Sequence, residues 1–322
     1  NVLYFNNIAR PMGMGGAFTA VEDPLQTHLY NPAAAEFNYT SRLQWSTTFD
    51  LIRALYIFIM LLDHVNATSG DDVKAMAFLS LVLSTANISL TSDTLFFKLN
   101  FMDQLISQGP DYPMYSSSFT MGIKFRGFLT GFQTGVTGHL YNLLSPGLPQ
   151  GHSVSWGLFY RSRPDSPFSL GLFYFHASDD MPWVRKPFEQ VLNNTFNFGA
   201  ACEVADRFTL SFDLRNINNF NLDAYLQPHF GLEKIFVIGR QGEGHMTLAL
   251  RAGTYYDSET KEVGWAGGFD YRLYWPDSRH SSLSRGNSGY LYAAYTLTRE
   301  EKVAAYDRIL TYNHIISIGM VF

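Results

Sequence analysis

The chain has 322 residues and a formal net charge of −5, and 16% of its residues are charged, against about 25% in a typical soluble domain. The acidic balance argues against nucleic-acid binding, which usually requires a basic patch, and an apolar content of 46% argues against disorder. The single cysteine, Cys202, excludes a disulfide framework and a cysteine metal cluster. No charge-free apolar run reaches the roughly 20 residues that a transmembrane helix needs.

The chain starts with Asn1 and the apolar run 2–5, without the basic region and cleavage site of a signal peptide. This start fits either a cytosolic protein or a mature form from which a signal has been removed. The remainder of the sequence decides between these two possibilities.

Residues 1–40 show no strand alternation and are expected to form a compact segment, which we call the hatch. The stretch 11–18 is rich in small residues, which let two backbones approach closely. Asp23 followed by Pro24 is typical of a helix start, with Asp as the N-cap and Pro at the first helical position. The hatch residues of interest are Gly13, Gly15, Gly16, Asn31, Pro32 and Ala33.

From residue 41 onward the sequence alternates with a period of two, which indicates β-strands. In 264–275, for example, Trp265 and Phe269 fall on one face whereas Ala266 and Asp270 fall on the other. Fourteen strands are predicted, over 42–51, 73–84, 92–101, 116–126, 128–141, 151–162, 167–176, 193–204, 207–216, 227–238, 245–255, 264–275, 288–298 and 311–322.

Repeated half-apolar strands fit either a soluble sandwich or a membrane barrel. The predicted strands match the roughly 9–11 residues of a tilted membrane strand and exceed the roughly 5–6 residues of a soluble one. Aromatic residues such as Trp265 and Trp275 end the apolar faces, and the polar faces combine Gly, Ser and Thr with isolated charges. The predicted fold is therefore an all-β, transmembrane antiparallel β-barrel of about 14 strands over 41–322, with the N-terminal hatch inside its lumen.

Connection lengths and the chain end also favour a barrel of the outer-membrane type. The odd-numbered connections are longer than most of the even-numbered ones, as expected if outer loops alternate with periplasmic turns. A final strand that ends on Phe322 resembles the end signal of bacterial outer-membrane barrels. The region 51–101 is the least defined, because its apolar run 55–62 does not alternate. We place 52–62 in the first outer loop; the alternatives are a membrane strand and a buried loop helix.

The hatch resembles a known family. The stretch 9–23, ARPMGMGGAFTAVED, followed by Asn31-Pro32-Ala33, is similar to the start of the FadL-like outer-membrane proteins. This superfamily includes fatty-acid and aromatic-hydrocarbon channels and the PorV/PorQ-type proteins tied to type IX secretion. The resemblance implies a fourteen-stranded barrel in the bacterial outer membrane, plugged by an N-terminal hatch with an Asn-Pro-Ala motif. In detail the stretch is closer to the PorV/PorQ branch, and the chain is shorter than typical fatty-acid channels.

The sequence shows no nucleotide, zinc or calcium motif, and its nine histidines are scattered. A hydrolase set built from His139, His176, Ser153 and Ser169 competes with simple hydrogen bonding in the lumen, which we favour. We therefore expect no enzymatic activity, no cofactor and no bound metal.

Charges on the polar faces form the main candidate ligand site. They could pair with one another across the lumen, pair with acids of the hatch, or bind an anionic head group, which Arg recognises bidentately. In the last case Arg215 and Arg251 form the site, and Arg272 pairs with a carboxylate. The basic set is Lys124, Arg126, Arg161, Arg215, Arg251 and Arg272; the acids are Glu203, Asp213 and Asp270 on the strands and Glu22, Asp23 and Glu36 in the hatch.

Two functions are compatible with this sequence. The favoured one is an outer-membrane channel for passive uptake or export of hydrophobic or amphipathic small molecules. The alternative is a non-transporting barrel subunit of the PorV/PorQ kind, which anchors or hands over a secretion or surface-assembly complex. The expected partners are outer-membrane lipid, a hydrophobic or amphipathic ligand and a secretion or surface protein complex, with no nucleic acid.

Overall fold

The structure is a computed structural model, and the account below concerns the residues that it describes. These are 3–5, 9–23, 30–34, 44–46, 48–50, 87–107, 113–143, 151–163, 166–177, 194–217, 226–239, 245–257, 261–274, 290–304 and 307–321.

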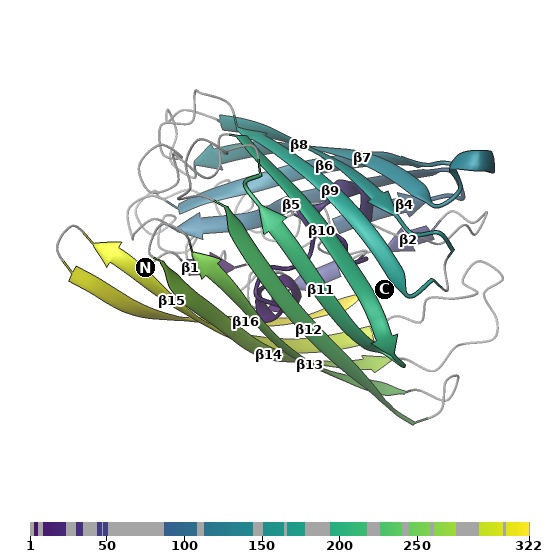
Figure 1. Cartoon of the computed structure of the whole chain (residues 1–322). Helices are drawn as coiled ribbons and strands as arrows, with labels where there is room; N and C mark the ends of the chain where they lie inside the picture. The colour runs from purple at the N-terminus through teal and green to yellow at the C-terminus, as the bar shows by residue number, and fades with distance from the viewer. Residues whose placement is uncertain are drawn as a thin grey trace, which may run out of the picture.

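Antiparallel β-strands dominate the fold (Figure 1). Among the described residues, no helix is long and apolar enough to span a membrane. Of the strands within these ranges, twelve have eight residues or more: β5 (Leu95–Ser107), β6 (Pro113–Lys124), β7 (Phe132–Leu143), β8 (Gly151–Tyr160), β9 (Phe168–Ala177), β10 (Asn194–Ala205), β11 (Phe208–Arg215), β12 (Gln227–Ile238), β13 (Met246–Asp257), β14 (Glu262–Tyr274), β15 (Tyr290–Ala304) and β16 (Asp307–Val321).

The strands form one sheet in which sequence neighbours pair from β4 to β16. At its two ends lie the short strands β2 (Gln44–Ser46), which pairs with β4 (Asn87–Thr91), and β3 (Thr48–Asp50), which pairs with β16. β2 and β3 do not pair with each other, but in the chain they are separated by a single residue, 47. The fold is thus an all-β antiparallel barrel of the outer-membrane type, as the alternation predicted.

The twelve predicted strands from 92–101 onward correspond to β5–β16, with shifts at their ends. The strand β4 was not predicted: its residues lie in the connection expected between the predicted strands 73–84 and 92–101. The predicted strand 42–51 is found as β2 and β3. The predicted strand 73–84, the predicted loop 52–62 and Phe322 lie outside the described residues.

The predicted alternation of connection lengths is wrong. The connection expected over 299–310 shrinks to 305–306, since β15 continues through the charged residues 299–302 to Ala304 and β16 already begins at Asp307. The connection between β14 and β15, expected over 276–287 as the one exception to the alternation, covers 275–289. We name the end of the barrel that carries connections 92–94, 125–131, 161–167, 206–207 and 239–245 the turn end, and the opposite end the loop end.

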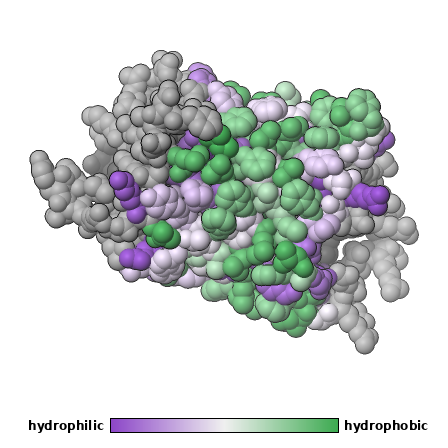
Figure 2. All heavy atoms as spheres, in the orientation of Figure 1, coloured by the Kyte–Doolittle hydropathy of each residue, from purple (hydrophilic) through white to green (hydrophobic). Residues whose placement is uncertain are grey.

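The barrel is apolar outside and polar inside. Figure 2 shows apolar side chains over much of the visible outer face, with hydrophilic ones mainly toward its two ends. Inward positions are polar and buried, whereas outward ones are apolar and exposed, which is the pattern of a strand between lipid and an occupied interior. Examples outside are Phe119, Met121, Leu210, Phe230, Leu250 and Phe269; examples inside are Thr120, Gln133, Ser155, Asp213, Glu233 and Asp270.

The hatch contains β1 (Leu3–Phe5), the helix α1 (Ala9–Gly13) and the 3-10 helix η1 (Pro32–Ala34). Its residues 9–23 and 30–34 lie inside the curved sheet (Figure 1), whereas β1 belongs to the sheet itself. β1 pairs with residues 105–107 of β5, so a short piece of strand is present where none was expected. Met14, Ala17 and Phe18 are fully buried, which makes the hatch the core of the molecule.

The facing of β11 is open to a chemical test. Leu210 is 42% exposed and Asp213 is fully buried, as the sequence predicted for apolar positions 208, 210, 212 and 214. A Leu210→Cys variant should react with a lipid-soluble thiol probe and resist a water-soluble one. The opposite labelling would mean that the strand is turned by one residue, which would place Asp213 in hydrocarbon.

Candidate functional site

Inward glycines of the barrel wall receive the hatch. We call them the glycine seat: Gly135, Gly157, Gly171, Gly199, Gly231 and Gly253. They come from β7, β8, β9, β10, β12 and β13, and they pair directly across the sheet as Gly135 with Gly157, Gly171 with Gly199, and Gly231 with Gly253. The seat therefore consists of three glycine pairs, and β11, which lies between β10 and β12, contributes no glycine to it.

The hatch backbone occupies the space that side chains would take at the seat. A Cβ atom at Gly253 would lie 2.1 Å from the backbone nitrogen of Gly15, and one at Gly171 would lie 2.1 Å from the carbonyl oxygen of Thr19. A Cβ atom at Gly135 would lie 2.8 Å from the backbone of Pro32. Such distances are far below van der Waals contact, so these wall positions accept only glycine while the hatch keeps its place.

Asp213 of β11 fixes the middle of the hatch. Its carboxylate is fully buried and accepts hydrogen bonds from the backbone nitrogens of Phe18 and Thr19, both at 2.9 Å, and from the Thr19 hydroxyl at 2.7 Å. Ser169 of β9 donates to the Ala20 carbonyl at 2.7 Å, and Thr296 of β15 donates to the Ala9 carbonyl at 2.7 Å. Most of these contacts address the hatch backbone rather than its side chains.

The Asn-Pro-Ala motif acts as a structural clasp. The Asn31 amide donates to the carbonyls of Thr19 at 2.8 Å and of Leu158 at 3.2 Å, while its oxygen accepts from the Ala33 nitrogen at 3.0 Å. This last bond is an Asx-type turn that starts η1. Asn31 thus ties two parts of the hatch to each other and to β8. The helix start expected at Pro24 lies outside the described residues.

A chain of buried charges joins α1 to three strands. Arg10 pairs with Asp23 at 2.7 Å and with Glu233 of β12 at 2.7 Å. Glu233 also pairs with Arg251 of β13 at 2.6 Å, and Arg251 continues to Asp270 of β14 at 3.2 Å. Arg272 completes the chain on Asp270 at 2.9 Å. Since the three cations alternate with three anions, each charge has an opposite partner in the interior.

Arg10 stays charged despite its burial. Removal from water disfavours its guanidinium ion, but the attraction of Glu233 and Asp23 outweighs this and raises the pKa of Arg10 above its ordinary value. Arg10 therefore contributes a permanent positive charge to the contact between hatch and wall.

The other predicted basic residues have different surroundings. Arg161, just after β8, pairs with Glu22 of the hatch at 2.9 Å. Arg215 donates to the Gly16 carbonyl and lies 5.7 Å above the Tyr30 ring. Lys124 is buried on the inward face of β6. Arg126 does not belong to the lumen set: β6 ends at Lys124, so Arg126 lies in the turn beyond it, exposed and paired with Asp93.

The structure thus brings Arg251 and Arg272 together through Asp270, and it places Arg215 and Arg161 at separate contacts with the hatch. Whether any of them binds an anionic ligand stays a prediction. Glu36 lies outside the described residues. Glu233, Arg10 and His229, whose Nδ1 donates to the Gly15 carbonyl at 2.6 Å, were missed as site residues.

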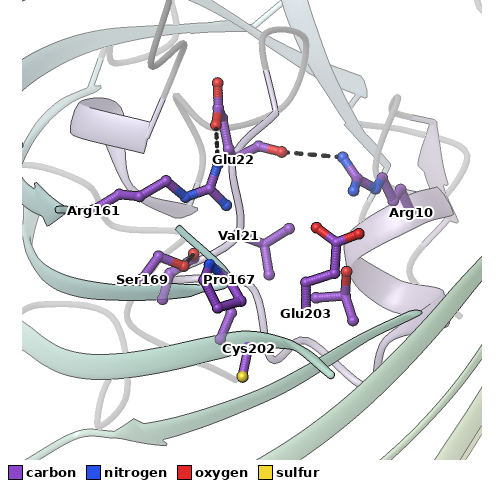
Figure 3. Close-up of a pocket in the computed structure, with 11 residues that line it drawn as sticks. Arg10, Val21, Glu22, Arg161, Pro167, Ser169, Cys202 and Glu203 are labelled. Atoms are coloured by element: carbon purple, nitrogen blue, oxygen red, sulfur yellow. Dashed lines mark hydrogen bonds and ion pairs between the residues drawn. The ribbon is translucent and has the colours of Figure 1, made fainter. Parts of the chain in front are cut away.

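A cavity of about 250 Å³ lies between the hatch and the wall at the turn end (Figure 3). The hatch contributes Arg10, Val21 and Glu22, and the wall contributes Arg161 and Glu203. Within the part of the chain that the structure describes, no group of three or more His, Cys, Asp or Glu residues could hold a metal ion.

Comparisons with known proteins add little to this geometry. No protein family and no curated protein matches the sequence. Among solved structures, the chain is similar to a bacterial polysaccharide outer membrane secretin, with a TM-score of 0.37 and 10% identity over 74% of this chain and 91% of that one. A likeness of this degree carries no argument about function, so the assignment to the outer-membrane β-barrel fold rests on the sheet, its inverted faces and its occupied interior.

Proposed function

We propose that this protein is a closed, non-conducting β-barrel of the bacterial outer membrane that serves as the membrane-embedded subunit of a secretion or surface-assembly complex. The observation that carries the proposal is the glycine seat, which holds the hatch by its backbone from strands β7 to β13. The proposal includes no catalytic activity and no cofactor.

The contacts of the hatch explain why the barrel would stay closed. Withdrawal of the hatch would break the ion pair of Arg10 with Glu233 and the three hydrogen bonds to Asp213. A buried charge that loses its partner costs about 3–5 kcal/mol, and at least two such contacts would have to be lost together. A hatch that moves out during each transport cycle is therefore unfavourable.

The resemblance of residues 9–23 and 31–33 to the PorV/PorQ branch supports the role in a complex. A sealed barrel that conducts nothing can still anchor other proteins, because its loops and turns remain available on both sides of the membrane. The charged lining of the cavity at the turn end, with Arg10, Glu22, Arg161 and Glu203, is poorly suited to an apolar ligand.

Conductance tests the closed state. The full chain in a planar bilayer should show no channel steps, whereas deletion of residues 1–40 should open the lumen and produce steady conductance. The refolded deletion variant is checked by its heat-modifiable mobility in gel electrophoresis. A silent deletion variant that folds normally would show that something other than the hatch closes the barrel.

The role in a complex is tested by purification of the intact protein from its native outer membrane after chemical cross-linking. A protein partner recovered in a fixed ratio supports the proposal. Purification as a single chain with a bound lipid-like molecule would instead support a transporter.

Passive transport of hydrophobic or amphipathic molecules is the second candidate, and one observation favours it. Among the described residues, no carboxylate lies within ion-pair distance of Arg215, and its buried Nε has no hydrogen-bond partner. A guanidinium in this state suits the head group of an amphipathic acid.

Replacement of Arg215 with Gln should then weaken the uptake of an acid by roughly tenfold or more, the value of a lost charged hydrogen bond. Uptake of a neutral hydrocarbon, measured in the same cells, should stay unchanged. Equal losses for both compounds, or none for either, would assign Arg215 to the support of the hatch alone. Arg251 is not replaced in this test, because its side chain is held between Glu233 and Asp270.

A further inference from the structure

The cavity at the turn end has opposite charges on two of its sides. Figure 3 shows Arg161 reaching in from one side and Glu203 from the other, with the side chain of Val21 between them. Its volume of about 250 Å³ is somewhat below the roughly 300–1,000 Å³ of typical ligand pockets. The cavity therefore suits a small molecule rather than a lipid tail or a large ligand.

Arg161 has unused hydrogen-bonding capacity. Its Nη1 donates to Glu22 at 2.9 Å, but its Nε is buried and has no partner. The side chain as a whole is 21% exposed, so the part of the guanidinium that faces the cavity can still bind an anionic oxygen of a ligand. The positive end of the cavity is thus prepared for an acceptor.

Glu203, an exposed side chain, supplies the opposite charge at the rim of the cavity. One of its oxygens accepts from the Arg207 nitrogen at 2.7 Å, and no cation of the described residues lies within ion-pair distance of it. Arg10, also in the lining, is already engaged by Glu233 and Asp23. The surplus charge of the lining is therefore the negative charge of Glu203, which suits an ammonium group.

We propose that this cavity binds a small zwitterion, with its anionic group on Arg161 and its ammonium group on Glu203. An anion alone would meet the negative charges of Glu22 and Glu203, and a cation alone would meet the positive charge of Arg161. Both a free amino acid and a phosphoethanolamine head group carry this pair of charges. The site does not depend on the proposed closed state of the barrel or on a protein partner.

Binding to the full chain in detergent is measured by isothermal titration calorimetry. The probes are glycine and O-phosphoethanolamine, which carry both charges, and acetate and methylammonium, which carry one each. At least one zwitterion should bind with a measurable affinity, and each single-charge probe should bind at least tenfold more weakly, since each lacks one charged hydrogen bond. The better zwitterion distinguishes a carboxylate ligand from a phosphate head group.

Two variants locate the site. Arg161→Gln and Glu203→Gln should each weaken the binding of the zwitterion by roughly tenfold or more. Arg163 is an exposed arginine in the same connection, so Arg163→Gln should leave the affinity unchanged. Folding of every variant is checked by heat-modifiable mobility. The proposal is overturned if neither zwitterion binds the wild type, if a single-charge probe binds as tightly, or if the control variant loses binding as much as the two site variants.

Discussion

Replacement of Gly253 with alanine should dislodge the hatch. The new Cβ atom would lie 2.1 Å from the Gly15 nitrogen and 2.2 Å from the Met14 carbonyl carbon, and both obstacles are backbone atoms that no rotamer change can move. Ordinary overpacking of a core costs about 1–3 kcal/mol, and a collision between two backbones should exceed this. We expect a lower midpoint of urea unfolding together with new conductance in planar bilayers.

Gly138→Ala is the matched control, because a Cβ atom there meets nothing within 4 Å. It lies on β7, outside the glycine seat, and should leave both the unfolding midpoint and the conductance of the wild type unchanged. If Gly253→Ala also behaved as wild type, the hatch would not be held at the seat in the way that the structure shows.

Glu233→Gln should cause the second large loss of stability. Glu233 is the shared anion of Arg10 and Arg251, so its neutralisation leaves two buried guanidinium groups with one carboxylate each. Breaking a buried ion pair costs about 3–5 kcal/mol, and the free energy of unfolding in urea should fall by an amount of this order. Asp206→Asn, at a side chain that is 89% exposed, should change it little.

A double-mutant cycle connects this effect to the hatch. Arg10→Gln and Glu233→Gln should be strongly non-additive, since each removes the same contact. Additive losses would mean that Glu233 acts through Arg251 alone and that the pair with Arg10 contributes nothing to the stability of the hatch.

The strands were predictable because the two faces of each one meet opposite environments. Along β14, Phe269 is 44% exposed and Asp270 is 4% exposed. The same contrast is visible in the sequence as an alternation of apolar and polar residues. Strand ends were less predictable, since β15 continues past its predicted end at residue 298 with residues such as Glu300 and Lys302. Alternation in hydropathy ends at the membrane boundary, whereas backbone pairing does not.

The candidate site was predicted only in part. Charges on inward faces were found, but their partners depend on the register between strands, which a single sequence does not give. Glu233 lies directly opposite Arg251 in the pairing of β12 with β13. The spacing of these two residues in the sequence does not predict that contact. A signal was nevertheless present, because His229, Gly231 and Glu233 alternate with Phe230 and Leu232. The glycines that recur on the polar faces were likewise visible in the sequence. Their role became clear only from the structure, in which the hatch backbone lies against them.

Residues of the hatch contact wall residues that lie far from them in the sequence, and this affects how the protein folds. Ala9 meets Thr296, 287 positions later, and Arg10 meets Glu233, 223 positions later. Contacts between residues this far apart along a chain are slow to form, because a long loop must close before any of them stabilises the folded barrel. The first segment of the chain therefore reaches its final position only after nearly the last strand has been laid down. Protection of residues 9–20 from a protease would then mark the completion of folding and would separate finished molecules from partly assembled ones.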